Sequence, residues 1–116
     1  MKLFWAPMTR SQRGIWMLEE AGVDYEMELV GLRDENRKDS PEFLAASPMG
    51  KVPALVDGDI HMAESAAICL YVADRYCPGM LAPAVDDPRR GQFLYWTMYT
   101  PAVVEPTMSE KVAGSE

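Results

Sequence analysis

Residues 52–62 read Val52-Pro53-Ala54-Leu55-Val56-Asp57-Gly58-Asp59-Ile60-His61-Met62. The first five residues are typical of a short strand, with Pro53 near its start. Asp57-Gly58 is a dipeptide that favours a two-residue type I′ turn, so residues 60–62 are expected to return as the antiparallel partner. A broad apolar face over residues 64–76 then predicts a helix. The middle of the chain therefore predicts a ββα unit.

The residues before this unit predict a βαβ unit. Residues 2–5 and 25–30 are typical of strands, and residues 12–21 have apolar side chains at helical spacing. Ser11 is a plausible N-cap for that helix, and Gly22 stands where a helix favours a left-handed residue. A crossover of this size makes its two strands parallel.

A polar loop over residues 31–40 and a short helix over residues 41–46, capped by Ser40, connect the two units. The fold class predicted from this order is α/β, a βαβ-ββα sandwich with a mixed four-stranded sheet.

The sequence changes character after the third helix. Residues 77–87 are rich in turn and linker residues, and a new helix is expected near Pro88, interrupted by Pro101 and Pro106. Its aromatic residues need a surface to pack on, which could be the first domain, a partner chain or the rest of a second domain. We favour the last, and divide the chain into a domain over 1–78, a linker over 79–87 and the first helix of a truncated all-helical domain over 88–116.

Composition excludes several classes of function. Eleven basic and eighteen acidic residues among 116 give a net charge of −7, which disfavours nucleic-acid binding. No apolar run approaches the length of a membrane span, and the first residues lack a signal peptide's apolar core, so a cytoplasmic protein is expected. Cys69 and Cys77 match neither a disulfide framework nor a metal motif, and with His61 as the single histidine no metal site is expected.

Three motifs closely resemble the glutathione-site signature of the glutathione S-transferases. They are Ser47-Pro48-Met49-Gly50-Lys51-Val52-Pro53-Ala54-Leu55, then Asp57-Gly58, then Ala63-Glu64-Ser65-Ala66-Ala67-Ile68. The start of the chain agrees, and the resemblance covers about residues 1–80. It implies a thioredoxin-like fold, glutathione as co-substrate, a small electrophile as second substrate, a homodimer and an all-helical second domain.

The resemblance also assigns ligand-binding residues. Val52 would pair through its main chain with the cysteinyl part of glutathione beside a cis Pro53, although a trans proline at a sheet edge is the usual structure for such a residue. Glu64 and Ser65, where a helix begins, would hold the γ-glutamyl group, or else simply cap the helix. Lys51 would meet the glycyl carboxylate, or remain solvated.

The catalytic group is expected in the loop after the first strand, where family members place a Tyr, Ser or Cys that hydrogen-bonds the glutathione sulfur. Aligning Arg13 with the arginine of serine-type members puts Thr9 at that position, and Ser11 is the second candidate, with an N-cap as its alternative role. Arg10 stands where cysteine-type bacterial members have their cysteine, so a serine- or theta-like bacterial type is expected. Trp5 is expected in the core.

The leading hypothesis is a glutathione transferase that activates the thiol through Thr9 or Ser11. The alternative is a non-catalytic glutathione-binding or assembly module of the same fold. A thioredoxin-type oxidoreductase is a poor third hypothesis because the chain has no CxxC motif.

Overall fold

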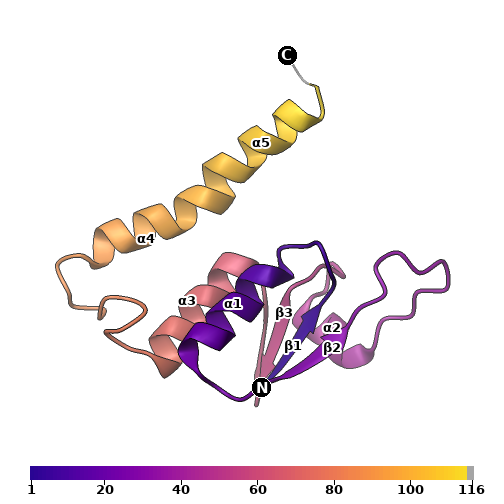
Figure 1. Cartoon of the computed structure of the whole chain (residues 1–116), viewed down its shortest axis with the longest axis horizontal. Coiled ribbons are helices and arrows are strands. Elements are labelled where there is room, and N and C mark those ends of the chain that lie inside the picture. Colours follow the sequence, from indigo (N-terminus) through magenta and orange to yellow (C-terminus); the bar gives the residue numbers. More distant parts are fainter. Residues whose placement is uncertain (115–116) are drawn as a thin grey trace.

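A computed structural model describes residues 1–114 and shows a four-stranded sheet with helices on both faces, followed by a helical rod (Figure 1). The elements follow the order β1 (Lys2–Trp5), α1 (Ser11–Ala21), β2 (Glu26–Leu29), α2 (Pro41–Ala46), β3 (Ala54–Asp57), β4 (Ile60–Ala63), α3 (Ser65–Tyr76), α4 (Arg90–Tyr99), η1 (Thr100–Val104) and α5 (Glu105–Val112). The predicted α/β class is confirmed.

The sheet has the strand order β2-β1-β3-β4. Strand β1 pairs parallel with β2, Leu3 lying opposite Met27, and antiparallel with β3, where Leu3 lies opposite Leu55. The crossover through α1 forces the parallel pair, and the tight turn between β3 and β4 forces an antiparallel one. The sheet is therefore mixed, as predicted.

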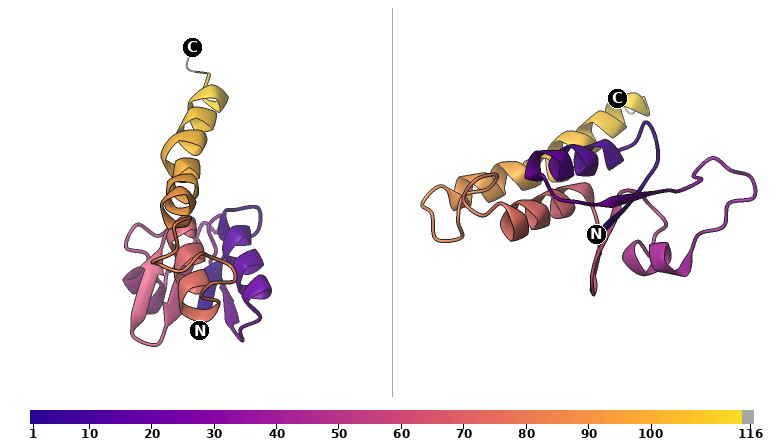
Figure 2. Two further views of the ribbon diagram at one scale, coloured as in Figure 1. Left: turned by 90° about the vertical axis from the view of Figure 1, so that its left-hand side faces the viewer. Right: turned by 60° about the horizontal axis from the view of Figure 1, so that its bottom comes forward.

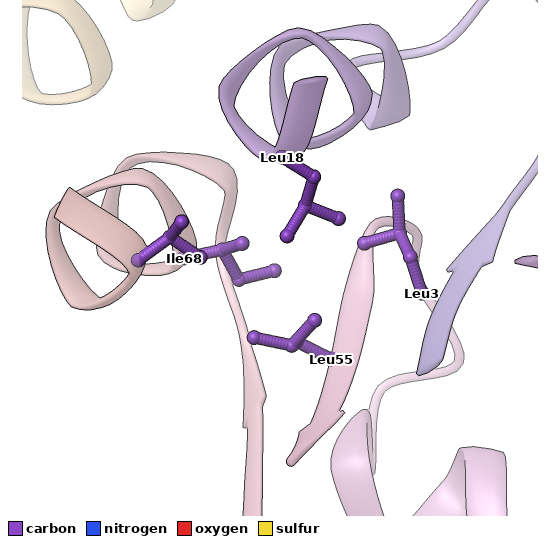
Figure 3. Packing of buried hydrophobic residues seen from close by; sticks show 5 residues of the cluster. Leu3, Leu18, Leu55 and Ile68 are labelled. Carbon is purple, nitrogen blue, oxygen red and sulfur yellow. The ribbon is translucent and has the colours of Figure 1, made fainter. Parts of the chain in front are cut away.

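Two apolar clusters hold the layers together, one on each face of the sheet. Helices α1 and α3 lie side by side on one face, and their side chains converge with those of the sheet in a cluster of Leu3, Leu18, Leu55, Ile68 and Val72 (Figures 2 and 3). On the other face α2 packs through Phe43 against Phe4, with ring centroids 5.3 Å apart. Because β1 contributes to both clusters, the loop that follows it is firmly anchored.

The hairpin differs from the prediction by one residue. Its two-residue turn is Gly58-Asp59, since Asp57 still pairs with Ile60. Gly58 has a φ of 60° and is the first central residue, where a type II′ turn needs glycine. The predicted turn at Asp57-Gly58 was wrong because the carboxylate of Asp57 accepts hydrogen bonds from Tyr71 and Tyr76 of α3, which keeps this residue in the strand.

The expected interruption at Pro101 is confirmed, because α4 ends at Tyr99, whereas the one expected at Pro106 was wrong, because Pro106 lies within the first turn of α5. Residues 90–112 form a helical rod in which η1 is a π-helical segment, with the Glu105 N–H donating to the Thr100 carbonyl. Proline clashes with the carbonyl four residues earlier in an α-helix, and a wider π turn relieves that clash. Arg90 ties the start of the rod to α3 through two hydrogen bonds to Asp74, both 2.8 Å long. Within residues 1–114 no helix has the length and apolarity that a membrane crossing requires.

Candidate functional site

A large open pocket lies between the loop after β1 and the turn before β3. Its volume is about 1140 Å³, and the residues around it include Thr9, Arg10, Arg13, Lys51 and Val52. The fold thus brings three predicted site residues, Thr9, Lys51 and Val52, to one pocket, although the first lies more than forty positions before the others.

The pocket is basic although the chain is acidic. Arg10 and Arg13 both form ion pairs with Glu105, and Arg37 pairs with Asp39 at 2.8 Å. Lys51 has no ion-pair partner among the described residues. Four cations and two carboxylates therefore leave two positive charges around the pocket, against −7 for the chain. Such a pocket favours an anionic ligand.

The two hydroxyl candidates form one short network. The Thr9 hydroxyl donates to the Ala6 carbonyl at 2.7 Å and lies 2.8 Å from the Ser11 hydroxyl. Thr9 is half-buried at the pocket, whereas Ser11 is fully buried, and its oxygen accepts the Ala6 N–H at 3.3 Å. The structure therefore gives Thr9 access to a ligand, and places Ser11 behind it.

Ser11 is not the N-cap of α1, contrary to that alternative. It is the first residue of the helix, and Arg10 precedes it without a side-chain capping bond. The Gln12 and Arg13 N–H groups instead donate to the Thr9 and Arg10 carbonyls. Because the backbone satisfies these donors, the Ser11 hydroxyl is available to support Thr9.

Two residues of the candidate site follow a strained position. Within residues 1–114, Met8 (φ 57°) and Glu64 (φ 75°) are the two non-glycine residues with positive φ. Met8 directly precedes Thr9, and Glu64 directly precedes Ser65. Side chains rarely adopt this conformation, and such residues cluster at active sites and ligand clamps.

The backbone at residues 47–53 is tightly fixed. The Val52–Pro53 peptide bond is cis. The Ser47 hydroxyl donates to the Lys51 carbonyl at 2.7 Å and accepts the Lys51 N–H at 2.9 Å. Arg37 donates to the Gly50 carbonyl at 2.7 Å, which ties the loop before α2 to this turn. The main chain of Val52 therefore has a fixed position beside the pocket.

Glu64 and Ser65 lie at the start of α3, and their two side chains differ in exposure. Glu64 is exposed, and its side chain makes no capping hydrogen bond, so the simple capping role predicted as an alternative is absent for this residue. Ser65 is 8% exposed, and its oxygen accepts a hydrogen bond from Arg13 at 3.3 Å. Arg13 therefore connects Ser65 to the pocket that contains Thr9.

Sequence reasoning missed Arg37 and Glu105. Glu105 is 92 positions from Arg13, so no local pattern could have paired them. Arg37 lies in a loop without periodicity, where an arginine is usually solvated.

Pro53 is buried next to Val52, and Cys69 is half-buried, with a thiol pKa raised by burial. No cluster of potential metal ligands occurs in the part of the chain that the structure describes.

Comparisons with known proteins point to one family. Residues 1–74 match the family model "Glutathione S-transferase, N-terminal domain". Glutathione S-transferase F10 of Arabidopsis thaliana is 37% identical over 115 residues, covering 90% of this chain and 52% of that protein. The chain thus spans about half the length of this relative.

Solved structures agree as well. A sphingomonad glutathione S-transferase complexed with glutathione has a TM-score of 0.73 and 36% identity, covering 88% of this chain and 51% of that one. Glutathione S-transferase I from maize, in complex with an atrazine glutathione conjugate, has a TM-score of 0.70 and 35% identity, covering 87% and 47%. The extent of the family-model match, together with the shared fold, shows that this chain belongs to the glutathione S-transferase family.

Proposed function

We propose that this chain binds glutathione in the basic pocket and that Thr9 activates the glutathione thiol for conjugation to small electrophiles, a detoxification reaction. The observation that carries the proposal is the common pocket of Thr9, Lys51 and Val52. The similar proteins support it, because the sphingomonad structure holds glutathione and the maize structure holds a glutathione conjugate.

The charge of the pocket suits this ligand. Glutathione has one net negative charge as a thiol and two as a thiolate, since its ammonium group offsets one of its two carboxylates. The uncompensated positive charges around the pocket therefore suit a ligand with a net negative charge. Lys51 would meet the glycyl carboxylate, and the main chain of Val52 would pair with the cysteinyl residue.

The start of α3 would hold the γ-glutamyl group. Glu64 is exposed and free of capping, so its carboxylate can meet the ligand ammonium. The Ser65 hydroxyl and the first N–H groups of α3 would meet the ligand carboxylate, since a helix N-terminus favours an anion. The Arg13 guanidinium adds a positive charge beside Ser65.

Thr9 would donate its hydroxyl proton in a hydrogen bond to the sulfur. A thiol with a pKa of about 8.5 is a few per cent ionised at neutral pH, and lowering this pKa by about two units needs roughly 2.7 kcal/mol of preferential thiolate stabilisation. Charge-assisted hydrogen bonds contribute about 1.5–3 kcal/mol each. One such hydrogen bond, together with the positive charge of the nearby arginines, is therefore enough to lower the thiol pKa by this amount.

Ser11 acts as a positioning residue in this proposal. Thr9 has a single hydroxyl proton, so when that proton is donated to Ala6 or to sulfur, the Ser11 proton is the one that joins the two hydroxyls. The Ser11 main-chain N–H also donates to the Thr9 oxygen at 3.2 Å. Two donors on the Thr9 oxygen polarise its hydroxyl and make it a stronger donor.

Replacing Thr9 tests the proposal. Thr9→Val keeps the shape of the side chain and removes the donor, so the thiol pKa of bound glutathione should rise by about one to two units while glutathione affinity changes little. Thr9→Ser should retain activity, and Thr107→Val is the matched control because its hydroxyl donates to the Val103 carbonyl of η1, away from the pocket. The thiolate absorbance of bound glutathione and turnover of an aryl chloride are the readouts. An unchanged thiol pKa in Thr9→Val would rule out the assignment.

A non-catalytic glutathione-binding or assembly module is the second candidate function. One observation favours it, because the Thr9 hydroxyl already donates to the Ala6 carbonyl and must leave this bond to reach sulfur. Glutathione binding without any conjugation by the full chain identifies this module.

The remaining proposals concern the whole protein. Trp96 and Tyr95 of α4 are more than half exposed, which supports packing against further helices or a second copy. On this basis we keep the division into residues 1–78, 79–87 and 88–116 and a homodimer as proposals. A cytoplasmic location is kept as a further proposal. Sedimentation of the full chain tests the dimer.

A further inference from the structure

A second cavity opens beside Arg10, the residue that follows Thr9, and its chemistry indicates which electrophiles the chain accepts. The cavity has a volume of about 430 Å³, within the range of small-molecule sites. It shares Arg10 and Arg13 with the pocket proposed for glutathione. An electrophile must approach the sulfur near Thr9, and Arg10 is the next residue in the chain, so this cavity lies where the second substrate is needed.

The far wall of the cavity is mostly apolar. Met108, Val112 and Ala113 line it, with Ser109 of α5 as the one polar residue among them. Met108 and Val112 are 61% and 87% exposed, so both can gain from covering the apolar body of a ligand. A substrate with an aromatic or aliphatic body fits this wall.

The near wall has a net positive charge. The carboxylate of Glu105, 16% exposed, is shared by Arg10 and Arg13, so two cations meet one anion. Arg10 contacts Glu105 through Nε at 3.0 Å, and its side chain is 55% exposed. Within residues 1–114 the Arg10 side chain pairs with Glu105 through Nε alone, and a guanidinium has five donors. Arg10 can therefore receive a second carboxylate, from a ligand.

We propose that Arg10 selects electrophiles that carry a carboxylate on an apolar body, with the carboxylate on the Arg10 guanidinium and the body on Met108 and Val112. The inference rests on the proposed transferase function and adds a substrate class to it. For an aryl chloride, the glutathione thiolate attacks the ring carbon that bears chlorine, a C–S bond forms, and chloride leaves with the electron pair of the C–Cl bond. No oxidant or reductant is needed.

The test compares an acid with its neutral isostere. The full chain is assayed with 4-chloro-3-nitrobenzoate and 4-chloro-3-nitrobenzamide, and the ratio of their kcat/KM values is taken for each variant, so that the different intrinsic reactivities cancel between variants. Arg10→Gln should lower this ratio about tenfold, the effect of one charge-assisted hydrogen bond in a partly exposed site. Arg10→Lys should lower it less, because an ammonium keeps the charge but lacks the planar fork.

Arg33→Gln is the matched control. It makes the same change of charge at an exposed arginine that lines neither cavity, so it should leave the ratio unchanged. Raising the salt concentration should reduce the preference of the parent chain for the acid, since a partly exposed ion pair is screened. If Arg33→Gln lowers the ratio as much as Arg10→Gln does, the overall charge of the protein sets the preference for the acid, and the proposal is overturned.

Binding of the unreactive pair 3-nitrobenzoate and 3-nitrobenzamide, measured by calorimetry, separates the two proposals. A chain that conjugates neither aryl chloride, yet binds the acid more tightly in an Arg10-dependent manner, overturns the transferase function and supports the anion site. Equal dissociation constants for acid and amide in the parent chain overturn the anion site, whatever the conjugation activity.

Discussion

The Tyr71 hydroxyl donates to the Asp57 carboxylate at an oxygen–oxygen distance of 2.6 Å, and this bond ties α3 to the end of β3. Tyr76, one turn and a half further along α3, donates to the same carboxylate oxygen. The start of α3, where Ser65 lies, therefore has its position fixed from the other end of the helix. Loss of this hydrogen bond should reduce the free energy of unfolding more than it reduces the affinity for a ligand.

Asp57→Ala should lower the free energy of unfolding by about 1–3 kcal/mol, because two half-buried hydroxyls lose their acceptor. Tyr71→Phe removes one donor and should cost about 0.5–1.5 kcal/mol. Urea unfolding measures both values. Tyr25→Phe serves as the control, since its hydroxyl bonds Glu19 at the surface, and an equal loss there would contradict the structural role of Asp57.

The same three residues predict a pH dependence. The hydroxyls of Tyr71 and then Tyr76 lower the pKa of Asp57 from its ordinary 3.8, so the stabilisation is complete above pH 3.8 and is lost as the pH falls through the lowered pKa. Burial and then Asp57 raise the pKa of Tyr71 from 10.0 to about 12, so its contribution is complete below pH 10.0 and is lost as the pH rises towards 12. The stability difference between the parent chain and Asp57→Ala should be flat between these limits and shrink outside them.

Gly50→Ala should destabilise the turn before β3. Gly50 has a φ of 67°, and a Cβ atom there would lie 3.2 Å from the Arg37 guanidinium. The backbone strain alone costs roughly 1–2 kcal/mol. Gly79→Ala is a matched control, with a φ of 75° and open space around its Cβ, so the difference in urea unfolding between the two variants isolates the contact with Arg37. A larger loss for Gly79→Ala would contradict this interpretation.

Arg37→Met should weaken glutathione binding. Its bond to the Gly50 carbonyl holds the turn that carries Lys51 and Val52, so a looser turn raises the KM for glutathione while kcat changes less. We expect a rise in KM of about fivefold to tenfold, equivalent to about one lost hydrogen bond. Lys38→Met, the neighbouring exposed cation, should leave KM unchanged. Equal effects of the two variants would indicate a simple charge effect.

Glu105→Gln should loosen the contact between α5 and the first domain. Glu105 pairs with Arg10 and Arg13 and is largely buried, and a neutral amide satisfies two guanidinium groups less well. Amide hydrogen exchange over residues 90–112 should accelerate about tenfold or more, with little change over residues 1–78. Glu35→Gln, an exposed loop residue, is the control. Unchanged exchange would show that the ion pairs do not hold the rod.

The sheet and its helices could be predicted from local patterns. Apolar spacing, Pro41 after Ser40, and Gly22 after Ala21 each act within one or two turns, and the structure confirms them. The hairpin was displaced by one residue because Asp57 is held by side chains of α3, which a local dipeptide preference does not contain.

The candidate site was predictable in part. Lys51 and Val52 from the motif before β3 and Thr9 from the loop after β1 line one pocket, whereas Ser65 lines another and is linked to the first through Arg13. The burial of Ser11, and the pairing of Arg13 with Glu105, depend on how distant segments pack, so spacing could not reveal them. The interruption of the α-helix at Pro101 was predicted, but its form, a π turn that keeps the chain helical, has no signal in a single sequence.

The wide turn of η1 also sets the direction in which Glu105 points. An α-helix rotates about 100° per residue, so one residue accommodated in a π turn shifts every later side chain around the rod by about that angle. With uninterrupted α geometry from residue 90 onward, the carboxylate would face away from α1, and Met108 and Val112 would turn with it. Pro101, which a local reading takes as a helix breaker, thus determines which side of the rod packs against the rest of the molecule.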